Sequence, residues 1–430
     1  MKLIISFVFL NVYVNLVSSK FCYWNSGCPY RYFSTKTPYN NVRGDIRDSI
    51  IKLQGCEPIS VWSLITDGNR NPGATFASGF EKALNVRNKI LTSYENGDSS
   101  LCAQDIQNLE EWNIDKKILA EPNSLTEEGK KEFFGLGERI QKAFSKLLNN
   151  LEDGDYELRP AAGDRIEDNV KAFIKGLRNE KLKIEKAKSG FDEIASYASC
   201  KNFQKDVEQN PKSLEEVVKY RKSTEYLAVK DRIQRRLGIK DDLADELLYV
   251  LYDLCRYVKA VNKNSPWCSI FTTDDLKSFE YIEDLEHYYK YGYGSPMSKQ
   301  LGDFPLAELL KNFKQVKEGK GKKLVAYFTN SIMTDMACTA LNLYKDEKPL
   351  TAARRDPNRN WRSAVLSSTS ANLLVVLNKC DNKGVADYNV VFYFNEEPLR
   401  SICEFGVCTW QEFEDKLGPS LNATAEYCGA

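Results

Sequence analysis

The sequence lacks an excess of charge of either sign, and it lacks long apolar runs beyond its N-terminus. Lysine plus arginine and aspartate plus glutamate number 60 each among the 430 residues. A balanced chain creates no overall field that would attract nucleic acid or an anionic membrane. After residue 19 no stretch is long and apolar enough to span a bilayer. We therefore expect no nucleic-acid partner and no membrane anchor, and any anion must be recognised by a local cluster of side chains.

Histidine is also scarce, because it occurs once, at position 287, whereas cysteine occurs 12 times. All the cysteines follow residue 19, and an even number suits the disulfides of an exported protein. Cys403 and Cys408 are close enough in sequence to form a local disulfide. Zinc is the competing interpretation of this pair, but neither a second close pair nor a nearby histidine completes a site. We expect a disulfide that joins Cys403 and Cys408, no metal site and no cofactor.

Residues 1–19 have the pattern of a signal peptide. A lysine supplies a positive charge, residues 3–16 are mostly apolar, and Val17 and Ser19 are the small residues of a cleavage site. The apolar stretch is short for a membrane-spanning helix and is interrupted by asparagines. We therefore expect a protein secreted to the extracellular space, with Asn422 of an Asn-Ala-Thr sequence as a glycosylation site.

Short apolar runs near both ends of the chain predict buried strands. The runs at 59–65 and 324–328 are rich in β-branched and aromatic residues, as in a sheet covered on both faces. Residues 372–378 and 388–394 predict two more strands. The middle of the chain predicts helices, one of them opened by a capping box at 124–127. This order indicates an α/β core interrupted by a helical insertion.

The first predicted strand runs into a polar turn, and open α/β sheets bind ligands at that edge. The turn resembles the signature of the histidine acid phosphatases, which reads Arg-His-Gly-x-Arg-x-Pro. The glycine, the second arginine and the proline of the signature are present as Gly68, Arg70 and Pro72. Thr66 stands in place of the first arginine, and Asp67 stands in place of the nucleophilic histidine.

Within that superfamily the resemblance is strongest to multiple inositol polyphosphate phosphatase. Residues 34–39 are similar to the N-terminal motif of that group, and residues 159–177 resemble a segment that supplies a further phosphate-binding arginine, here Arg165. Other similar stretches are 281–289, 341–347 and 361–363. The resemblance thus spans nearly the whole mature chain. It implies phosphate-binding roles for Arg70 and Arg165, a weaker one for Lys36, and a degenerate position at Thr66.

The resemblance also implies the fold and its division into domains. We expect a histidine-phosphatase-like mixed sheet flanked by helices, with a helical insertion domain. Residues 20–103 and 306–430 are assigned to the α/β core, to which 156–177 contributes. Residues 104–155 and 178–305 are assigned to the helical insertion.

The proton-donor motif of the group, His-Ala-Glu, reads Asn330-Ser331-Ile332 in this chain. In the mechanism of the family an imidazole attacks phosphorus, arginines offset the charge on the phosphoryl oxygens, and an acid protonates the leaving alkoxide. Asn330 cannot supply a proton, and Ile332 can neither donate nor accept one. No catalytic group is therefore intact, which predicts an inactive pseudophosphatase that acts as a binding or interaction scaffold.

Two residues are candidates for an altered mechanism. His287 lies far in sequence from both motifs, and we expect a surface or packing residue. Asp67 is a candidate aspartyl nucleophile, but aspartate-based phosphatases place a second carboxylate two positions on, where this chain has Asn69. Two alternative functions stay open at this point. One is an active phosphatase of inositol polyphosphates, and the other is a small-ligand scavenger.

Asp67 also has a consequence for binding. The resemblance implies that Arg70 and Arg165 face one pocket, with Asp67 where a phosphate oxygen would approach. A carboxylate about 4 Å from a guanidinium interacts with it by a few kcal/mol at intermediate dielectric, and it repels a phosphate dianion. We therefore expect a phosphorylated small molecule such as an inositol polyphosphate as a ligand, with an affinity weakened by Asp67. The sequence identifies no protein partner.

Overall fold

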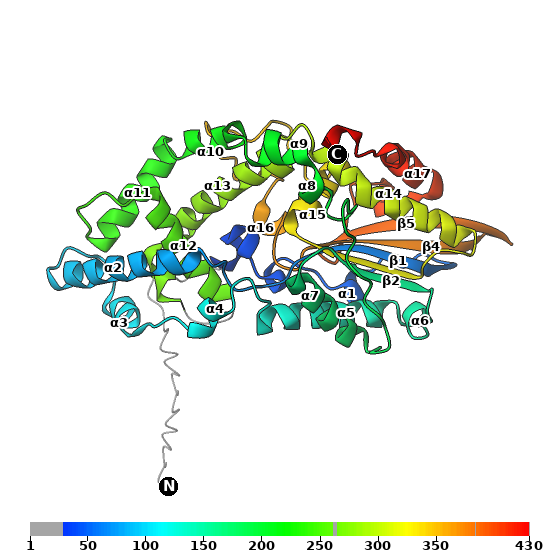
Figure 1. Cartoon of the computed structure of the whole chain (residues 1–430), viewed down its shortest axis with the longest axis horizontal. Helices are drawn as coiled ribbons and strands as arrows, with labels where there is room; N and C mark the ends of the chain where they lie inside the picture. The colour runs from blue at the N-terminus through cyan, green and yellow to red at the C-terminus, as the bar shows by residue number, and fades with distance from the viewer. Residues whose placement is uncertain (1–28, 261–264, 383, 430) are drawn as a thin grey trace, which may run out of the picture.

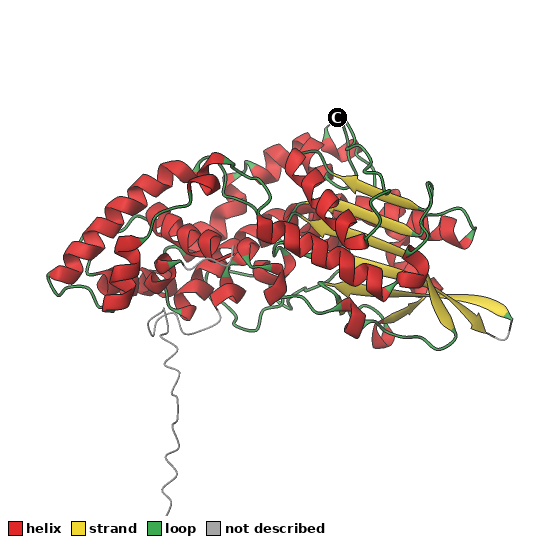
Figure 2. Ribbon diagram, turned by 90° about the horizontal axis from the view of Figure 1, so that it is seen from below, coloured by secondary structure: helices red, strands yellow, loops and turns green. Residues whose placement is uncertain are grey.

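The computed structural model describes residues 29–260, 265–382 and 384–429 (Figure 1). Residues 1–19, for which we predict a signal peptide, lie outside the described residues. A single mixed sheet occupies the right of Figure 1 with helices on both sides, and a largely helical region lies to its left. Figure 2 shows the same two regions from below. This architecture confirms the predicted fold class.

The described strands form one sheet in the order β2-β3-β1-β4-β5-β6, and β7 pairs with β5. Their bounds are Cys56–Thr66 for β1, Tyr156–Pro160 for β2, Leu324–Thr329 for β3, Asn372–Asn382 for β4, Val385–Phe394 for β5, Glu397–Pro398 for β6 and Val407–Thr409 for β7. β3 lies between β1 and β2 and is parallel to both. Thr66 pairs with Thr329, and Pro160 pairs with Phe328, so these strands end at the same edge.

The helices around the sheet and in the helical region vary in length. Those before residue 180 are α1 (Ile46–Ser49), α2 (Phe76–Glu95), α3 (Ala103–Glu111), α4 (Lys116–Ala120), α5 (Glu127–Ala143), α6 (Ser145–Leu148) and α7 (Asp164–Leu177). The later ones are α8 (Ser196–Ser199), α9 (Lys201–Phe203), α10 (Glu215–Tyr220), α11 (Thr224–Leu237), α12 (Asp245–Ala260), α13 (Thr273–Tyr291), α14 (Ser298–Lys317), α15 (Ser331–Ala340), α16 (Ser363–Leu366) and α17 (Trp410–Leu417).

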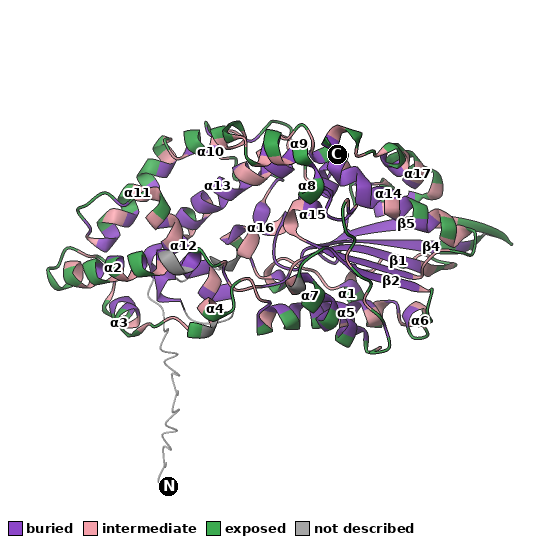
Figure 3. Cartoon of the chain, in the orientation of Figure 1, coloured by how far each residue is buried: buried purple, intermediate pink, exposed green. Residues whose placement is uncertain are grey.

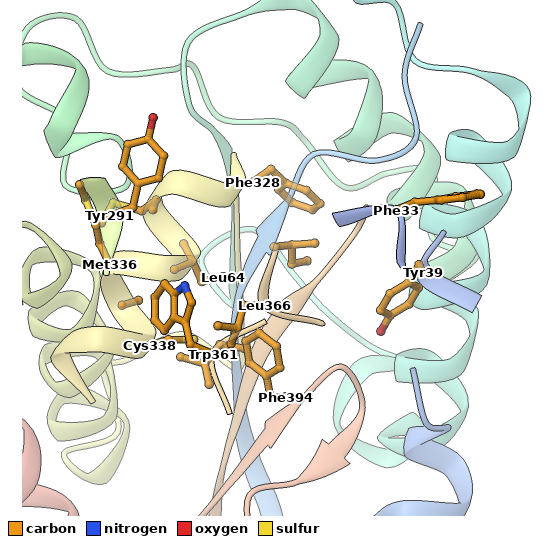
Figure 4. Close-up of a cluster of buried hydrophobic side chains, with 14 of the residues drawn as sticks. Phe33, Tyr39, Leu64, Tyr291, Phe328, Met336, Cys338, Trp361, Leu366 and Phe394 are labelled. Carbon is orange, nitrogen blue, oxygen red and sulfur yellow. The ribbon is translucent and has the colours of Figure 1, made fainter. Parts of the chain in front are cut away.

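Helices cover both faces of the sheet, as the continuous apolar runs of its central strands predict. In Figure 1 α5, α6 and α7 lie below the sheet, and α14, α15 and α17 lie above it. Figure 3 shows the strands buried between these layers. Figure 4 shows part of the core, where Leu64 of β1, Met336 and Cys338 of α15 and Leu366 of α16 lie together.

The domain boundaries remain a prediction, although the place of one helix bears on them. α2 lies inside the range 20–103 that we assign to the core. It packs against α3 and α12 of the helical region, on the left of Figure 1.

One strand and one helix start differ from the sequence pattern. β2 alternates Glu157 and Arg159 with apolar residues, so it has no continuous apolar run, as suits a strand at the edge of the sheet. The capping box predicted at 124–127 is wrong, because Thr126 is the N-cap of α5 and its hydroxyl accepts a hydrogen bond from the Gly129 N–H at 3.1 Å. Ser124 precedes the helix, and its backbone carbonyl accepts the N–H of Asn71 at 2.9 Å.

A buried ion pair fastens the N-terminal segment to the sheet. Arg139 of α5 donates from Nε to Glu396 Oε2 and from Nη2 to Glu396 Oε1, both at 2.7 Å. The Glu396 side chain is fully buried, with 0% exposed. It also accepts the Tyr39 hydroxyl at 2.7 Å and the Ile46 N–H at 3.2 Å. One carboxylate therefore joins α5, the turn after β5 and the segment that leads into β1.

Disulfides link segments that lie far apart in the sequence. Among the described residues the pairs are Cys56–Cys380, Cys200–Cys428, Cys255–Cys268 and Cys403–Cys408. The last is the local pair expected from the sequence. Cys338 is buried and is the one described cysteine without a disulfide. No helix in the described ranges is long and apolar enough to cross a membrane.

Candidate functional site

A cavity of about 280 Å³ lies at the edge of the sheet where β1 and β3 end. Its wall combines a 3-10 helix, η3 (Ser34–Lys36), with the loop after β1 and the beginnings of α7 and α15. The lining residues are Thr35, Lys36, Thr66, Asp67, Gly68, Asn69, Arg70, Arg165, Tyr257, Ala260, His287, Tyr291, Asn330, Ser331, Ile332, Ser367, Ser368 and Thr369. The phosphate-binding and catalytic positions expected from the sequence therefore all lie in one cavity.

The loop after β1 is held in place by the buried carboxylate of Glu132, on α5. Glu132 Oε2 accepts the Asn69 N–H at 3.1 Å and the Ser370 hydroxyl at 3.0 Å. Gly68 precedes Asn69 and has no room for a side chain, because a Cβ there would lie 2.7 Å from the Phe133 ring. The glycine and the buried acid together fix the direction in which Asp67 and Arg70 enter the cavity.

Asp67 lies between two arginines that come from different elements. Its Oδ2 is 3.4 Å from Nε of Arg70 and 3.4 Å from Nε of Arg165, at the start of α7. Arg70 also donates to Asn123 Oδ1 at 2.8 Å, whereas Arg165 has no hydrogen-bond partner among the described residues. The carboxylate thus occupies the space between the guanidinium groups, where it offsets part of their positive charge.

The positions of the family's first arginine and of its acid motif carry no catalytic group. Thr66 is buried, and its hydroxyl donates to the Ser368 carbonyl at 3.1 Å. Asn330 caps α15 by accepting the Ile332 N–H at 3.2 Å, and its amide donates to the Tyr197 hydroxyl. Ile332 contributes an apolar side chain to the cavity wall. Proton donation to a leaving group is therefore absent at these positions.

Lys36 gives the cavity a positive charge that depends on pH. Its ammonium group donates to Thr35 Oγ1 at 2.9 Å. Burial, and then the positive charges of Arg70 and Arg256, lower the pKa of Lys36 from 10.5 to about 7. The lysine therefore gains or loses its charge close to neutral pH.

His287 lies in the cavity wall, which the sequence did not indicate. It is a well-packed residue of α13 with 11% of its side chain exposed, and its Nδ1 lies 2.6 Å from Asp335 Oδ2. Asp335 belongs to α15, 48 residues away in sequence. We expected a surface or packing residue because His287 lies far in sequence from both phosphatase motifs. In the structure α13 packs against α15 and brings the imidazole to the site.

Comparison with known proteins gives the family. The profile described as "Histidine phosphatase superfamily (branch 2)" matches residues 68–395. The chain is 28% identical over 404 residues to multiple inositol polyphosphate phosphatase 1 of Drosophila melanogaster, covering 90% of this chain and 84% of the relative. It is 24% identical over 400 residues to the Homo sapiens protein of the same name, covering 86% and 82%.

Solved structures share the fold at lower identity. The phytase from D. castellii has a TM-score of 0.75 at 15% identity, with 93% of this chain and 88% of that chain covered. The multiple inositol polyphosphate phosphatase of Bifidobacterium longum, in complex with inositol hexasulfate, has a TM-score of 0.69 at 14% identity, with 92% and 99% covered. These similarities support the same architecture for the sheet and its helices.

The family profile covers most of the chain, and the relatives match it over nearly its whole length. The resemblance inferred from the signature around Gly68 and Arg70 is thereby confirmed. This protein belongs to branch 2 of the histidine phosphatase superfamily.

Proposed function

We propose that this protein is a secreted pseudophosphatase, a catalytically inactive member of its family whose cavity binds a phosphorylated small molecule such as an inositol polyphosphate. The observation that carries the proposal is the position of Asp67. Its carboxylate stands where the family has the attacking imidazole, 3.4 Å from each of the two arginines. In this role the fold is a binding or interaction scaffold.

The absence of catalysis follows from the chemistry of the substituted positions. No imidazole follows β1, so a phosphohistidine cannot form at the family's nucleophile position. Ile332 cannot protonate a leaving alkoxide, and general acid catalysis alone contributes about 10²–10⁴-fold to rates. Asp67 itself is a weak nucleophile because its oxygen is held by two cations.

Binding of an anion is supported by the cations that remain. Arg70, Arg165 and Lys36 all line the cavity, and guanidinium groups are well suited to phosphate. The relative from Bifidobacterium longum is described in complex with inositol hexasulfate and with phosphate. A ligand of this class fits the charge of the cavity better than an apolar molecule does, which disfavours a scavenger of an apolar ligand.

The alternative of an aspartate-based phosphatase is not favoured by the surroundings of Asp67. The residue two positions on, Asn69, is 3% exposed. Its Nδ2 donates to the Ala260 carbonyl at 3.0 Å and its Oδ1 accepts the Thr126 hydroxyl at 2.8 Å. This side chain is committed to the core and does not stand beside Asp67 as a second catalytic group.

Secretion is supported by the N-terminal sequence pattern and by the disulfides. Bonds such as Cys200–Cys428 persist in oxidising compartments and are rare in the cytosol. Asn422 is exposed, as a glycan acceptor must be. Expression in a eukaryotic cell line tests both points, because the protein should be recovered from the medium and should lose mass on removal of N-linked glycans.

Phosphate release from p-nitrophenyl phosphate and inositol hexakisphosphate tests the proposal. The assay covers pH 4 to 9 with and without magnesium, and multiple inositol polyphosphate phosphatase 1 of Homo sapiens serves as the positive control. We expect no phosphate above the buffer background. Turnover at a rate comparable to that of the control, at any pH, would contradict the proposal.

The substitution Asp67→Asn tests whether this carboxylate weakens binding. Removing one negative charge beside Arg70 and Arg165 should tighten the binding of inositol hexakisphosphate by at least about tenfold, measured by calorimetry at pH 7. Asp168→Asn is the matched control, because Asp168 is a half-exposed carboxylate of α7 that pairs with Lys171 outside the cavity. Equal affinities for Asp67→Asn and the unaltered protein would show that Asp67 does not compete with the ligand.

A further inference from the structure

The single histidine is held by a buried carboxylate and a hydroxyl. Asp335 is completely buried and lies 2.6 Å from His287 Nδ1. The Ser367 hydroxyl, just after α16, donates to Asp335 Oδ1 at 2.7 Å and lies 3.0 Å from Oδ2. A histidine whose Nδ1 is bound to a carboxylate has a fixed ring orientation, with Nε2 left for another partner.

Nε2 of His287 has no hydrogen-bond partner among the described residues, whereas the residue itself lines the cavity. The ring packs edge-on against Tyr291, with 5.1 Å between the ring centroids. Asp335 lies one helical turn after Ile332 on α15, and it contacts the imidazole from beneath the cavity wall without lining the cavity itself. His287 and Ile332, which stands where the family has its acid, therefore line the same cavity.

We propose that His287, protonated and positioned by Asp335 and Ser367, is a ligand of the anion in the cavity and donates a hydrogen bond from Nε2 to a phosphate or sulfate oxygen. This inference rests on the proposed function, because it names a further cation of the same binding site. The ligand it implies is a polyanion, such as a polyphosphorylated or polysulfated polyol, that reaches from Arg70 and Arg165 to α13.

The surroundings of His287 favour its protonated form. Burial lowers its pKa, but the hydrogen bond and the charge of Asp335 outweigh burial, and with the charges of Glu286 and Glu283 the pKa is raised above 6.5. Glu286 and Glu283 lie on its own helix, and Asp335 lies on α15. The charged groups that share the cavity with it are Lys36 of η3, Asp67 and Arg70 of the loop after β1, and Arg165 of α7.

The pKa of Lys36 is lowered to about 7 and the pKa of His287 is raised above 6.5, so both groups gain protons as the pH falls. As the pH falls from 8 to 6 the cavity becomes more positive, and a ligand of constant charge should bind more tightly. Phosphate esters gain a proton of their own near pH 6 and lose charge there. Inositol hexasulfate stays fully ionised over this range, so with this probe any pH dependence reports the protein alone.

Histidine NMR gives a test that needs no substitution, because the chain has one histidine. The imidazole resonances of a tag-free, ¹⁵N-labelled protein are followed from pH 5 to 9 with and without saturating inositol hexasulfate. A ligand that binds the protonated form must raise the pKa of His287, and we expect an increase of at least about half a pH unit. No change in this pKa at saturation would overturn the inference.

Substitution separates the new ligand from a purely structural ion pair. At pH 6 the affinity of inositol hexasulfate for the unaltered protein should be about tenfold higher than its affinity for the variant His287→Gln. At pH 8 this difference in affinity should shrink to about twofold. Asp335→Asn keeps the imidazole but removes the carboxylate that binds it. The increase in affinity with falling pH should then occur at a lower pH than in the unaltered protein. A structural pair predicts the same affinity for all three proteins at both pH values.

The two proposals fail in different ways. If inositol hexasulfate binds the unaltered protein but His287→Gln binds equally well, the role of His287 is wrong and anion binding by Arg70 and Arg165 stands. If the unaltered protein binds neither inositol hexasulfate nor inositol hexakisphosphate at pH 6 or 8, the binding function itself is wrong, and the role of His287 is wrong with it.

Discussion

Joint replacement of the four substituted positions, Thr66→Arg, Asp67→His, Asn330→His and Ile332→Glu, is expected to turn this protein into a phosphatase. The histidine at 67 supplies the nucleophile, the glutamate at 332 supplies the acid, and the arginine and histidine add hydrogen bonds to the phosphoryl group. Acid catalysis contributes on the order of 10²–10⁴-fold, and one preorganised hydrogen-bond donor contributes on the order of 10²–10³-fold. We expect an activity at least about a thousandfold above the background of the unaltered protein.

The structure explains why these distant substitutions should act together. Thr66 ends β1, and its strand partner Thr329 directly precedes Asn330. The parallel register therefore sets the two motifs side by side, and all four positions line the same cavity. Arg70 and Arg165 are freed at the same time, because the carboxylate between them is removed.

Phosphate release from p-nitrophenyl phosphate and inositol hexakisphosphate measures the recovery. The matched control carries Thr66→Arg, Asn330→His and Ile332→Glu but keeps Asp67, and it should stay inactive because position 67 has no imidazole to attack phosphorus. An inactive fourfold variant whose circular dichroism and melting temperature match those of the unaltered protein would contradict our assignment of the catalytic positions.

The second large effect concerns stability, and it comes from the ion pair of Arg139 with Glu396. Removing one partner of a buried ion pair typically costs about 3–5 kcal/mol, because it leaves an uncompensated buried charge. Arg139→Met leaves the fully buried Glu396 carboxylate without its bidentate partner. We expect the free energy of unfolding to fall by this amount, measured by urea denaturation followed by tryptophan fluorescence.

This loss should reach the cavity as well. Glu396 binds the hydroxyl of Tyr39, and the Tyr39 N–H donates to Glu132, which in turn holds Asn69 of the loop after β1.

Lys183→Met is the control, since Lys183 pairs with Asp153 at the surface and both side chains are 72% exposed. That change should leave the free energy of unfolding nearly unchanged, because an exposed ion pair contributes little to stability. A similar small loss for Arg139→Met would show that the ion pair does not stabilise the fold.

The sequence predicted the central sheet well because its strands are continuous apolar runs. The runs at 59–65 and 324–328 fall within β1 and β3, and both strands are buried on two faces. The edge strand β2 was not predictable in this way, since Glu157 and Arg159 interrupt its apolar pattern. The start of α5 was mispredicted because Ser124 and Thr126 are both good caps, and it is the Thr126 hydroxyl that accepts the Gly129 N–H.

The candidate site was predictable only where family motifs mark it. Asp67, Arg70, Arg165, Asn330 and Ile332 were found by resemblance, and they meet in one cavity. Glu132 gave no such signal, and His287 lies in the similar stretch 281–289, to which the resemblance gives no role in the site. His287 Nδ1 contacts Asp335, which is 48 residues away in sequence, and Glu132 accepts the N–H of Asn69, which is 63 residues away. Contacts of this kind depend on helix packing, which no local pattern encodes.

Phosphorus NMR of inositol hexakisphosphate, incubated for a day at pH 6 with an excess of the unaltered protein, tests the central claim in one sample. Without an imidazole after β1, the resonances of the ligand should shift or broaden as it binds, and no signal of inorganic phosphate should grow. A growing phosphate signal, with lower inositol phosphates appearing beside it, would contradict the account.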